Sequence, residues 1–183
     1  MKKNILIALF AVAAIAPVAA QAQTYIGASI GRAEQKLVFE DIGSLKDTDT
    51  SYKLFGGYQF TKNVGIEAGF ADLGTISISG AGETLKSNPK MFFVAATGSI
   101  PVSEVVSLTG KVGFARTSTT MTVVGEGEEK VKHTSPLLGV GVSFAVTPTI
   151  AIVAEYEHFF NIISEDGIKL KANALSAGVR FSF

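Results

Sequence analysis

Apolar residues alternate with small, polar or charged residues along most of the chain after residue 22. Between residues 64 and 70, for example, Val64, Ile66 and Phe70 alternate with Gly65 and Glu67. A period of two places successive side chains on opposite faces of a β-strand. Alternation in segments of about ten residues is typical of strands with lipid on one face and a barrel lumen on the other. The pattern therefore predicts a transmembrane β-barrel.

Turn-forming residues divide this region into eight alternating segments, and the connections between them are short and long in turn. We expect strands near 24–33, 51–60, 64–73, 90–100, 105–116, 133–146, 150–159 and 171–183. The short connections are 61–63, 101–104 and 147–149, and the longer polar ones are 34–50, 74–89, 117–132 and 160–170. Barrels of the bacterial outer membrane have short periplasmic turns and longer external loops. The expected fold is all-β: an eight-stranded antiparallel up-and-down barrel with both termini in the periplasm.

One stretch could be misread as a transmembrane helix, because Pro136–Ala154 holds 19 residues without a charge. Leu138, Val140 and Val142 still alternate with glycines there, and Pro148 interrupts the run. Glycine and β-branched residues disfavour a helix, and proline marks a turn more readily than a helix interior. We expect two strands joined by a tight turn.

The first 22 residues have the three parts of a secretory signal peptide. Two lysines follow Met1, Ile5–Ala16 is an apolar run, and Ala20-Gln21-Ala22 provides the small residues of a cleavage site. The apolar run is too short for a stable membrane anchor, although retention as an N-terminal anchor is the alternative. We expect residues 1–22 to be removed and residues 23–183 to form the barrel domain.

Composition agrees with this class of protein. Only 17% of the residues are charged, against about a quarter in an ordinary soluble domain. Loss of Lys2 and Lys3 would leave 14 basic and 16 acidic residues, a net charge of −2. This balance gives no basic footprint for nucleic acid. There is no cysteine and no motif for a metal or a phosphate, so we expect no cofactor.

The last strand ends in an aromatic residue. Phe181 and Phe183 lie on one apolar face that alternates with Ser176, Gly178 and Arg180. A terminal phenylalanine at this position resembles the recognition signal of the barrel-assembly machinery. We therefore expect the assembly machinery and periplasmic chaperones to be partners, and the outer membrane to be the location.

Several local motifs resemble the transmembrane domain of the outer membrane protein A family. The motifs are Phe55-Gly56-Gly57-Tyr58-Gln59, Val64–Phe70 with Leu73-Gly74, Ser135-Pro136 through Gly139-Val140-Gly141 to Glu155-Tyr156, and Leu175–Phe181. We expect a structural role in the envelope and contacts at the cell surface. Larger members of the family carry a periplasmic peptidoglycan-binding domain, and because this sequence stops at Phe183 we do not expect a role that depends on it.

Six charged residues occupy strand positions that alternate with the lipid-facing apolar residues and therefore point into the lumen. They are Lys53, Glu67, Lys111, Glu155, Glu157 and Arg180. Ionised groups in a narrow interior require partners, so we expect them to form a polar core that closes the barrel. The resemblance implies an internal salt-bridge network, with Glu67 and Glu155 at matching positions. Val153 replaces a basic residue of the family motif, so the network is not transferred whole. A small-solute or ion pore gated by these charges is the alternative.

Two other functions have features in the sequence that bear on them. His133-Thr134-Ser135 has the histidine-x-serine spacing that resembles the lipid A deacylases, but Pro136 departs from that motif and no acid follows at the expected distance. We therefore do not expect an enzyme or any catalytic residue. The polar loops are long enough to contact lipopolysaccharide, phage or host molecules, because loops on a rigid scaffold often carry recognition. Outer-membrane lipids and lipopolysaccharide are the expected surroundings.

Overall fold

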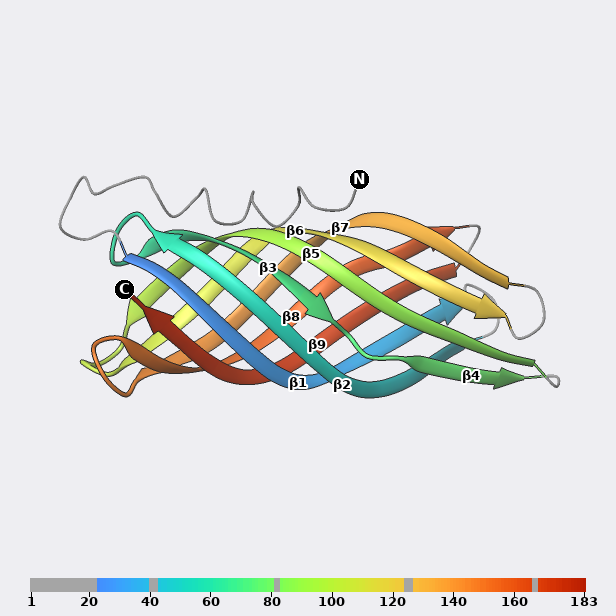
Figure 1. Ribbon diagram of the computed structural model, residues 1–183, viewed down its shortest axis with the longest axis horizontal. Coiled ribbons are helices and arrows are strands. Elements are labelled where there is room, and N and C mark those ends of the chain that lie inside the picture. The colour runs from blue at the N-terminus through green and yellow to red at the C-terminus, as the bar shows by residue number, and fades with distance from the viewer. Residues whose placement is uncertain (1–22, 40–42, 81–82, 124–126, 166–167) are drawn as a thin grey trace, which may run out of the picture.

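The computed structural model describes residues 23–39, 43–80, 83–123, 127–165 and 168–183, which form one closed antiparallel sheet (Figure 1). Within these residues the strands are β1 (Gln23–Phe39), β2 (Gly43–Gln59), β3 (Val64–Asp72), β4 (Ile76–Gly80), β5 (Glu83–Pro101), β6 (Val106–Val123), β7 (Gly127–Ala145), β8 (Ile150–Glu165) and β9 (Ile168–Ser182). Because β5 pairs with both β3 and β4, these two are halves of one barrel strand. The prediction of an eight-stranded up-and-down barrel is therefore confirmed.

Closure joins the first strand to the last. β1 pairs with β9 from Tyr25 opposite Ser182 to Phe39 opposite Ile168. The C-terminus and the start of β1 lie at the same end of the barrel as the three short turns (Figure 1). The predicted signal peptide, residues 1–22, lies outside the described residues.

No helix in the described part of the chain is long and apolar enough to cross a membrane. The charge-free stretch is divided between β7 and β8, as expected from its alternation. Along the described strands, the apolar set faces outwards, with exposed fractions of 55% for Ile30 and 64% for Val140.

The predicted extents of the four long loops are wrong. Most of residues 34–50, 74–89, 117–132 and 160–170 continue the strands, so β5 and β7 are each 19 residues long. The ladder of β6 and β7, for instance, runs without a shift to Val123 opposite Gly127. Strands that project beyond the bilayer have water outside, so apolar–polar alternation fades although the backbone pairing continues.

A bulge interrupts the third barrel strand. Between the pairs Asp72–Lys90 and Ile76–Ser87, three residues of one strand face two of the other. Proline has no N–H to donate and is found in sheets mainly at edges and bulges, and Pro89 lies at this point. Leu73 N donates to Pro89 O at 3.2 Å, while the buried Gln35 side chain donates to Leu73 O at 3.2 Å. The amide of Gln35 thus replaces the donor that proline lacks.

Hydrogen bonds with side chains of neighbouring strands fix the backbone conformation of the bulge. Gly74 has a positive φ of 78°, a conformation that favours glycine. Asp49 accepts hydrogen bonds from Thr75 N and Thr50 N, both at 2.7 Å, and these amides hold the pKa of its carboxyl below the ordinary value. Asn88 donates to Thr75 Oγ1 at 2.9 Å. The bulge is therefore a defined turn rather than a gap in the sheet.

The three short turns repeat one arrangement of hydrogen bonds. In each, a serine or threonine side chain accepts from the backbone N–H groups two and three residues later, and the residues are Thr61, Ser103 and Thr147. The backbone also closes alike, with Phe60 N donating to Val64 O, Val102 N to Val106 O and Val146 N to Ile150 O at 2.8–2.9 Å. Hydroxyl side chains favour turns because they satisfy such amides locally.

Candidate functional site

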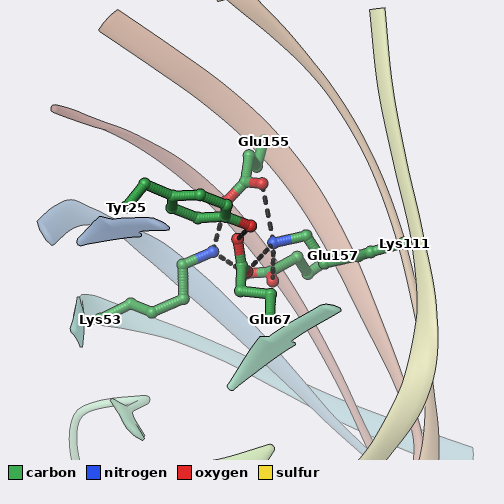
Figure 2. Close-up of polar contacts among 6 residues, drawn as sticks. All are labelled: Tyr25, Lys53, Glu67, Lys111, Glu155 and Glu157. Carbon is green, nitrogen blue, oxygen red and sulfur yellow. Dashed lines mark hydrogen bonds and ion pairs between the residues drawn. The ribbon is translucent and has the colours of Figure 1, made fainter. Parts of the chain in front are cut away.

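A cluster of charged side chains crosses the lumen (Figure 2). It is built from four separate barrel strands, because the period of two turns these positions inwards on each strand. Its members are Lys53 of β2, Glu67 of β3, Lys111 of β6, and Glu155 and Glu157 of β8. Each of these side chains is at most 10% exposed. We refer to these five residues as the luminal cluster.

Lys111 lies at the centre of the luminal cluster. Its ammonium nitrogen is 2.6 Å from Glu67 Oε1, 2.7 Å from Glu155 Oε1 and 3.3 Å from Glu157 Oε1. Lys53 completes the set with contacts of 2.5 Å to Glu155 Oε2 and 2.8 Å to Glu157 Oε2. Lys111 therefore contacts carboxylates of β3 and β8, on opposite parts of the barrel wall, whereas both contacts of Lys53 are with β8.

Aromatic rings surround the two ammonium groups. Lys53 and Lys111 lie 5.3–6.0 Å from the ring centroids of Phe55 and Phe93, within the range of a cation–π interaction. Tyr25 donates its hydroxyl to Glu67 Oε2 at 3.0 Å. Low-dielectric walls of this kind strengthen the ion pairs, and they also raise the cost of leaving one charge unpaired.

Glycine makes room for the central lysine. A Cβ atom at Gly139 would lie 2.6 Å from Lys111 Cγ and 3.3 Å from Glu157 Cγ. Such approaches would force the lysine side chain to move. Gly139 of β7 thus allows Lys111 to reach across the lumen.

Arg180 differs from the other predicted luminal charges. It makes no ion pair with any described carboxylate; its guanidinium carbon lies 5.2 Å from the Tyr25 ring, and Nη2 is 3.4 Å from Ser143 Oγ. The hypothesis that all six charges form one network is therefore wrong in its last member. Together, three basic and three acidic groups still balance in this part of the lumen.

The luminal cluster lies between an apolar layer and a polar cavity. Towards the rim far from the termini, the fully buried side chains include Leu73, Met91, Phe93, Leu137 and Phe159. Towards the short turns, a cavity of about 30 Å³ is lined by polar groups that include Gln59, Asn63, Thr97, Thr109 and Arg180. This space suits a few water molecules.

The histidine-x-serine pair does not form a catalytic contact in the structure. Ser135 is buried, and its hydroxyl has no hydrogen-bond partner among the described residues. His158 lies on the outer face, as its parity predicts, and its Nδ1 is 2.5 Å from Asn173 Oδ1.

Sequence reasoning missed Tyr25. The signal was available, because residue 25 has the opposite parity to the outward-facing Ile26 and Ile30. Attention to charged residues alone overlooked a neutral donor that satisfies one of the carboxylate oxygens.

The closed sheet, the outward apolar belt and the charged interior together define a β-barrel of the bacterial outer membrane. Residues 5–183 match the family model described as the outer membrane protein β-barrel domain, and the chain belongs to this family. It is 30% identical over its whole length to outer membrane protein A of Escherichia fergusonii. It is 29% identical over 86% of its length to outer membrane protein P5 of Haemophilus influenzae. The chain spans about half the length of the curated relatives it matches, 56% and 51% respectively.

Solved structures support the same fold. Neisserial surface protein A superposes with a TM-score of 0.69 and 19% identity, covering 87% of this chain and 97% of that protein. Ail, the attachment invasion locus protein of Yersinia pestis, superposes with a TM-score of 0.57 and 25% identity, covering 88% of this chain and 99% of that one. The family match and the curated relatives place the protein in the outer membrane. In barrels of this class the short turns face the periplasm.

Proposed function

We propose that this protein is an outer-membrane barrel without an open conduit, which contributes to envelope integrity and makes contacts at the cell surface. The observation that carries the proposal is the luminal cluster, whose ion pairs join four strands across the lumen. An ion crossing this level would have to separate buried pairs, and breaking such a pair costs about 3–5 kcal/mol. The apolar layer above the cluster adds a second barrier.

Surface contact is supported by the part of the protein that remains accessible. With a filled lumen, the external rim and the outer wall are the surfaces left for a partner. Ail, which has a similar barrel, has been crystallised with the heparin analogue sucrose octasulfate. By analogy, the proposed role includes recognition of a ligand at the external rim.

A gated pore for small solutes or ions is the second candidate. The polar cavity on the periplasmic side reaches Lys111 and Glu155 from below, so a rearrangement of the luminal cluster could extend it. The two candidates differ in whether the protein at rest conducts.

Planar-bilayer conductance of protein purified from outer membranes distinguishes the two candidates. We expect no discrete openings from the wild type or from Lys62→Ala, a control in an exposed periplasmic turn. Discrete wild-type openings that change in Lys111→Ala or Glu67→Ala would overturn the closed-barrel proposal in favour of the gated pore. Heat-modifiable gel mobility would establish that each variant is folded.

A further inference from the structure

The outer wall changes from apolar to basic at the external boundary of the membrane. Arg116 lies ten residues after Val106, where β6 begins at the periplasmic turn. At about 3.3 Å per residue and a strand tilt near 40°, this distance corresponds to about 25 Å along the barrel axis, the height of the apolar band in such barrels. Phe114, 64% exposed, lies two residues closer to the periplasm on the same face of β6, and Phe92, 55% exposed, lies directly opposite Arg116. Arg116 therefore lies where acyl chains give way to headgroups.

Three basic residues gather there on three neighbouring strands, which run side by side in Figure 1. Lys90 of β5 lies opposite Ser118 of β6, and Ser118 lies opposite Lys132 of β7. Arg116 is two residues before Ser118 on β6, so it lies on the same outer face but closer to the bilayer. It is directly opposite Phe92 of β5. Because paired strands are about 4.8 Å apart, the backbone positions of Lys90 and Lys132 are about 10 Å apart. We call Lys90, Arg116 and Lys132 the basic patch.

The basic patch is only partly neutralised by the protein. Lys90 is 3.8 Å from Asp72 Oδ2, a long contact between partly exposed groups. Neither Arg116 nor Lys132 has a carboxylate within ion-pair distance in the described part of the chain. Like charges gathered on one face of a sheet disfavour each other, so an anionic partner would stabilise this arrangement.

We propose that the basic patch binds the phosphorylated sugar headgroup of lipopolysaccharide in the outer leaflet. The guanidinium of Arg116 can donate two parallel hydrogen bonds to one phosphate, and the two lysines can approach a second anionic group as point charges. The exposed Phe114, on the bilayer side of Arg116, fits the acyl chains of the same molecule. A ligand with several anionic groups on a rigid sugar matches a patch that spans three strands, whereas phosphatidylglycerol carries only one phosphate.

This inference deepens the surface-contact part of the proposed function, but it does not depend on whether the lumen conducts. It depends on the outer-membrane location and on the outward faces of β5, β6 and β7. Conductance would therefore overturn the closed barrel without affecting the basic patch, and the reverse also holds.

The test is binding of purified lipid A to the detergent-solubilised protein, followed by microscale thermophoresis. The test variant is Lys90→Gln/Arg116→Gln/Lys132→Gln. The control is Lys62→Gln, which removes a positive charge from an exposed periplasmic turn, away from the outer-leaflet boundary. It is matched to the single variant Lys132→Gln. We expect at least about tenfold weaker binding for the test variant, since each basic residue near an anionic surface contributes roughly fivefold, and unchanged binding for the control.

Two further arms identify the ligand group. Dephosphorylated lipid A should bind the wild type as weakly as intact lipid A binds the test variant, and phosphatidylglycerol in the same detergent should bind weakly to both. Equal affinities of wild type and test variant would overturn the proposal, as would equal losses in Lys132→Gln and Lys62→Gln or equal binding of phosphatidylglycerol. Lys132→Gln alone, which alters one exposed side chain, provides an intermediate loss should the triple variant not fold.

Discussion

At the scale of single residues, Lys111 connects two strands on opposite parts of the wall. Its contacts with Glu67 of β3 and Glu155 of β8 lie within 2.6–2.7 Å. Removing a buried partner from such a set leaves an uncompensated charge, and that penalty exceeds the net value of the pair. The luminal cluster therefore matters most when it is incomplete.

Lys111→Met should lower the free energy of unfolding by about 3–5 kcal/mol, because three carboxylates lose their shared cation. The double variant Lys111→Met/Glu67→Gln should recover part of this loss, since it removes one charge of each sign. Urea unfolding in lipid vesicles, followed by gel mobility, measures both. Lys62→Met, in an exposed turn, is the control and should leave the midpoint unchanged. An equal midpoint for Lys111→Met and wild type would contradict a stabilising role of the ion pairs.

The alternation of positions along each strand was enough to predict that the charged residues point inwards, because the period of two fixes the face of each side chain. It could not predict which partners meet across the lumen. That depends on barrel stagger and side-chain reach, which placed Arg180 beside Tyr25 rather than beside a carboxylate. The alternation of apolar and polar residues also could not predict the bulge, although the sequence contains Pro89 and Gly74 at that point.

At the scale of elements, the periplasmic turns use one design three times. Thr61, Ser103 and Thr147 each satisfy two backbone amides that the ladder leaves without partners. The surrounding sequences differ, so the hydroxyl side chain and the flanking apolar residues carry the common structure. The positions of these turns could be predicted, whereas their shared geometry required the structure.

Thr61→Val should destabilise the barrel by about 1 kcal/mol, because valine matches the shape of threonine but cannot accept from the amides of Asn63 and Val64. Thr61→Ser should retain most of the stability. Thermal denaturation in detergent provides the comparison, with Lys62→Ala as a neighbouring control whose side chain is exposed. Identical melting temperatures for Thr61→Val and Lys62→Ala would show that the hydroxyl makes no contribution.

At the scale of the whole molecule, strand length was the main error of the sequence-based prediction. Alternation ends where the bilayer ends, but the sheet continues beyond it. The closure of β1 on β9 is part of the predicted barrel, and it extends from Tyr25 to Phe39 on β1. At the periplasmic end of this pairing, one further hydrogen bond joins the two strands, in which Phe183 N donates to Thr24 O at 3.0 Å.

The C-terminal aromatic side chain should matter more in cells than in the test tube. Phe183 is 65% exposed, so Phe183→Ala removes little packing and should change the refolded stability by less than about 1 kcal/mol. Loss of recognition by the assembly machinery should instead lower the amount of Phe183→Ala in the outer membrane severalfold. Fractionation of cells expressing Phe183→Ala, with Phe181→Ala for comparison, measures this effect. Normal membrane levels of Phe183→Ala would contradict the predicted assembly signal.

The luminal cluster also has a consequence for the path of insertion. Its charges come from β2, β3, β6 and β8, so no hairpin of adjacent strands contains the full set. A partly curled sheet would present unpaired ions to hydrocarbon, at a cost of several kcal/mol for each. The bilayer itself thus penalises every incomplete intermediate, and only a sheet that has curled fully can enter without that penalty. The charged residues that fill the finished barrel therefore also disfavour, during insertion, every sheet that has not yet closed.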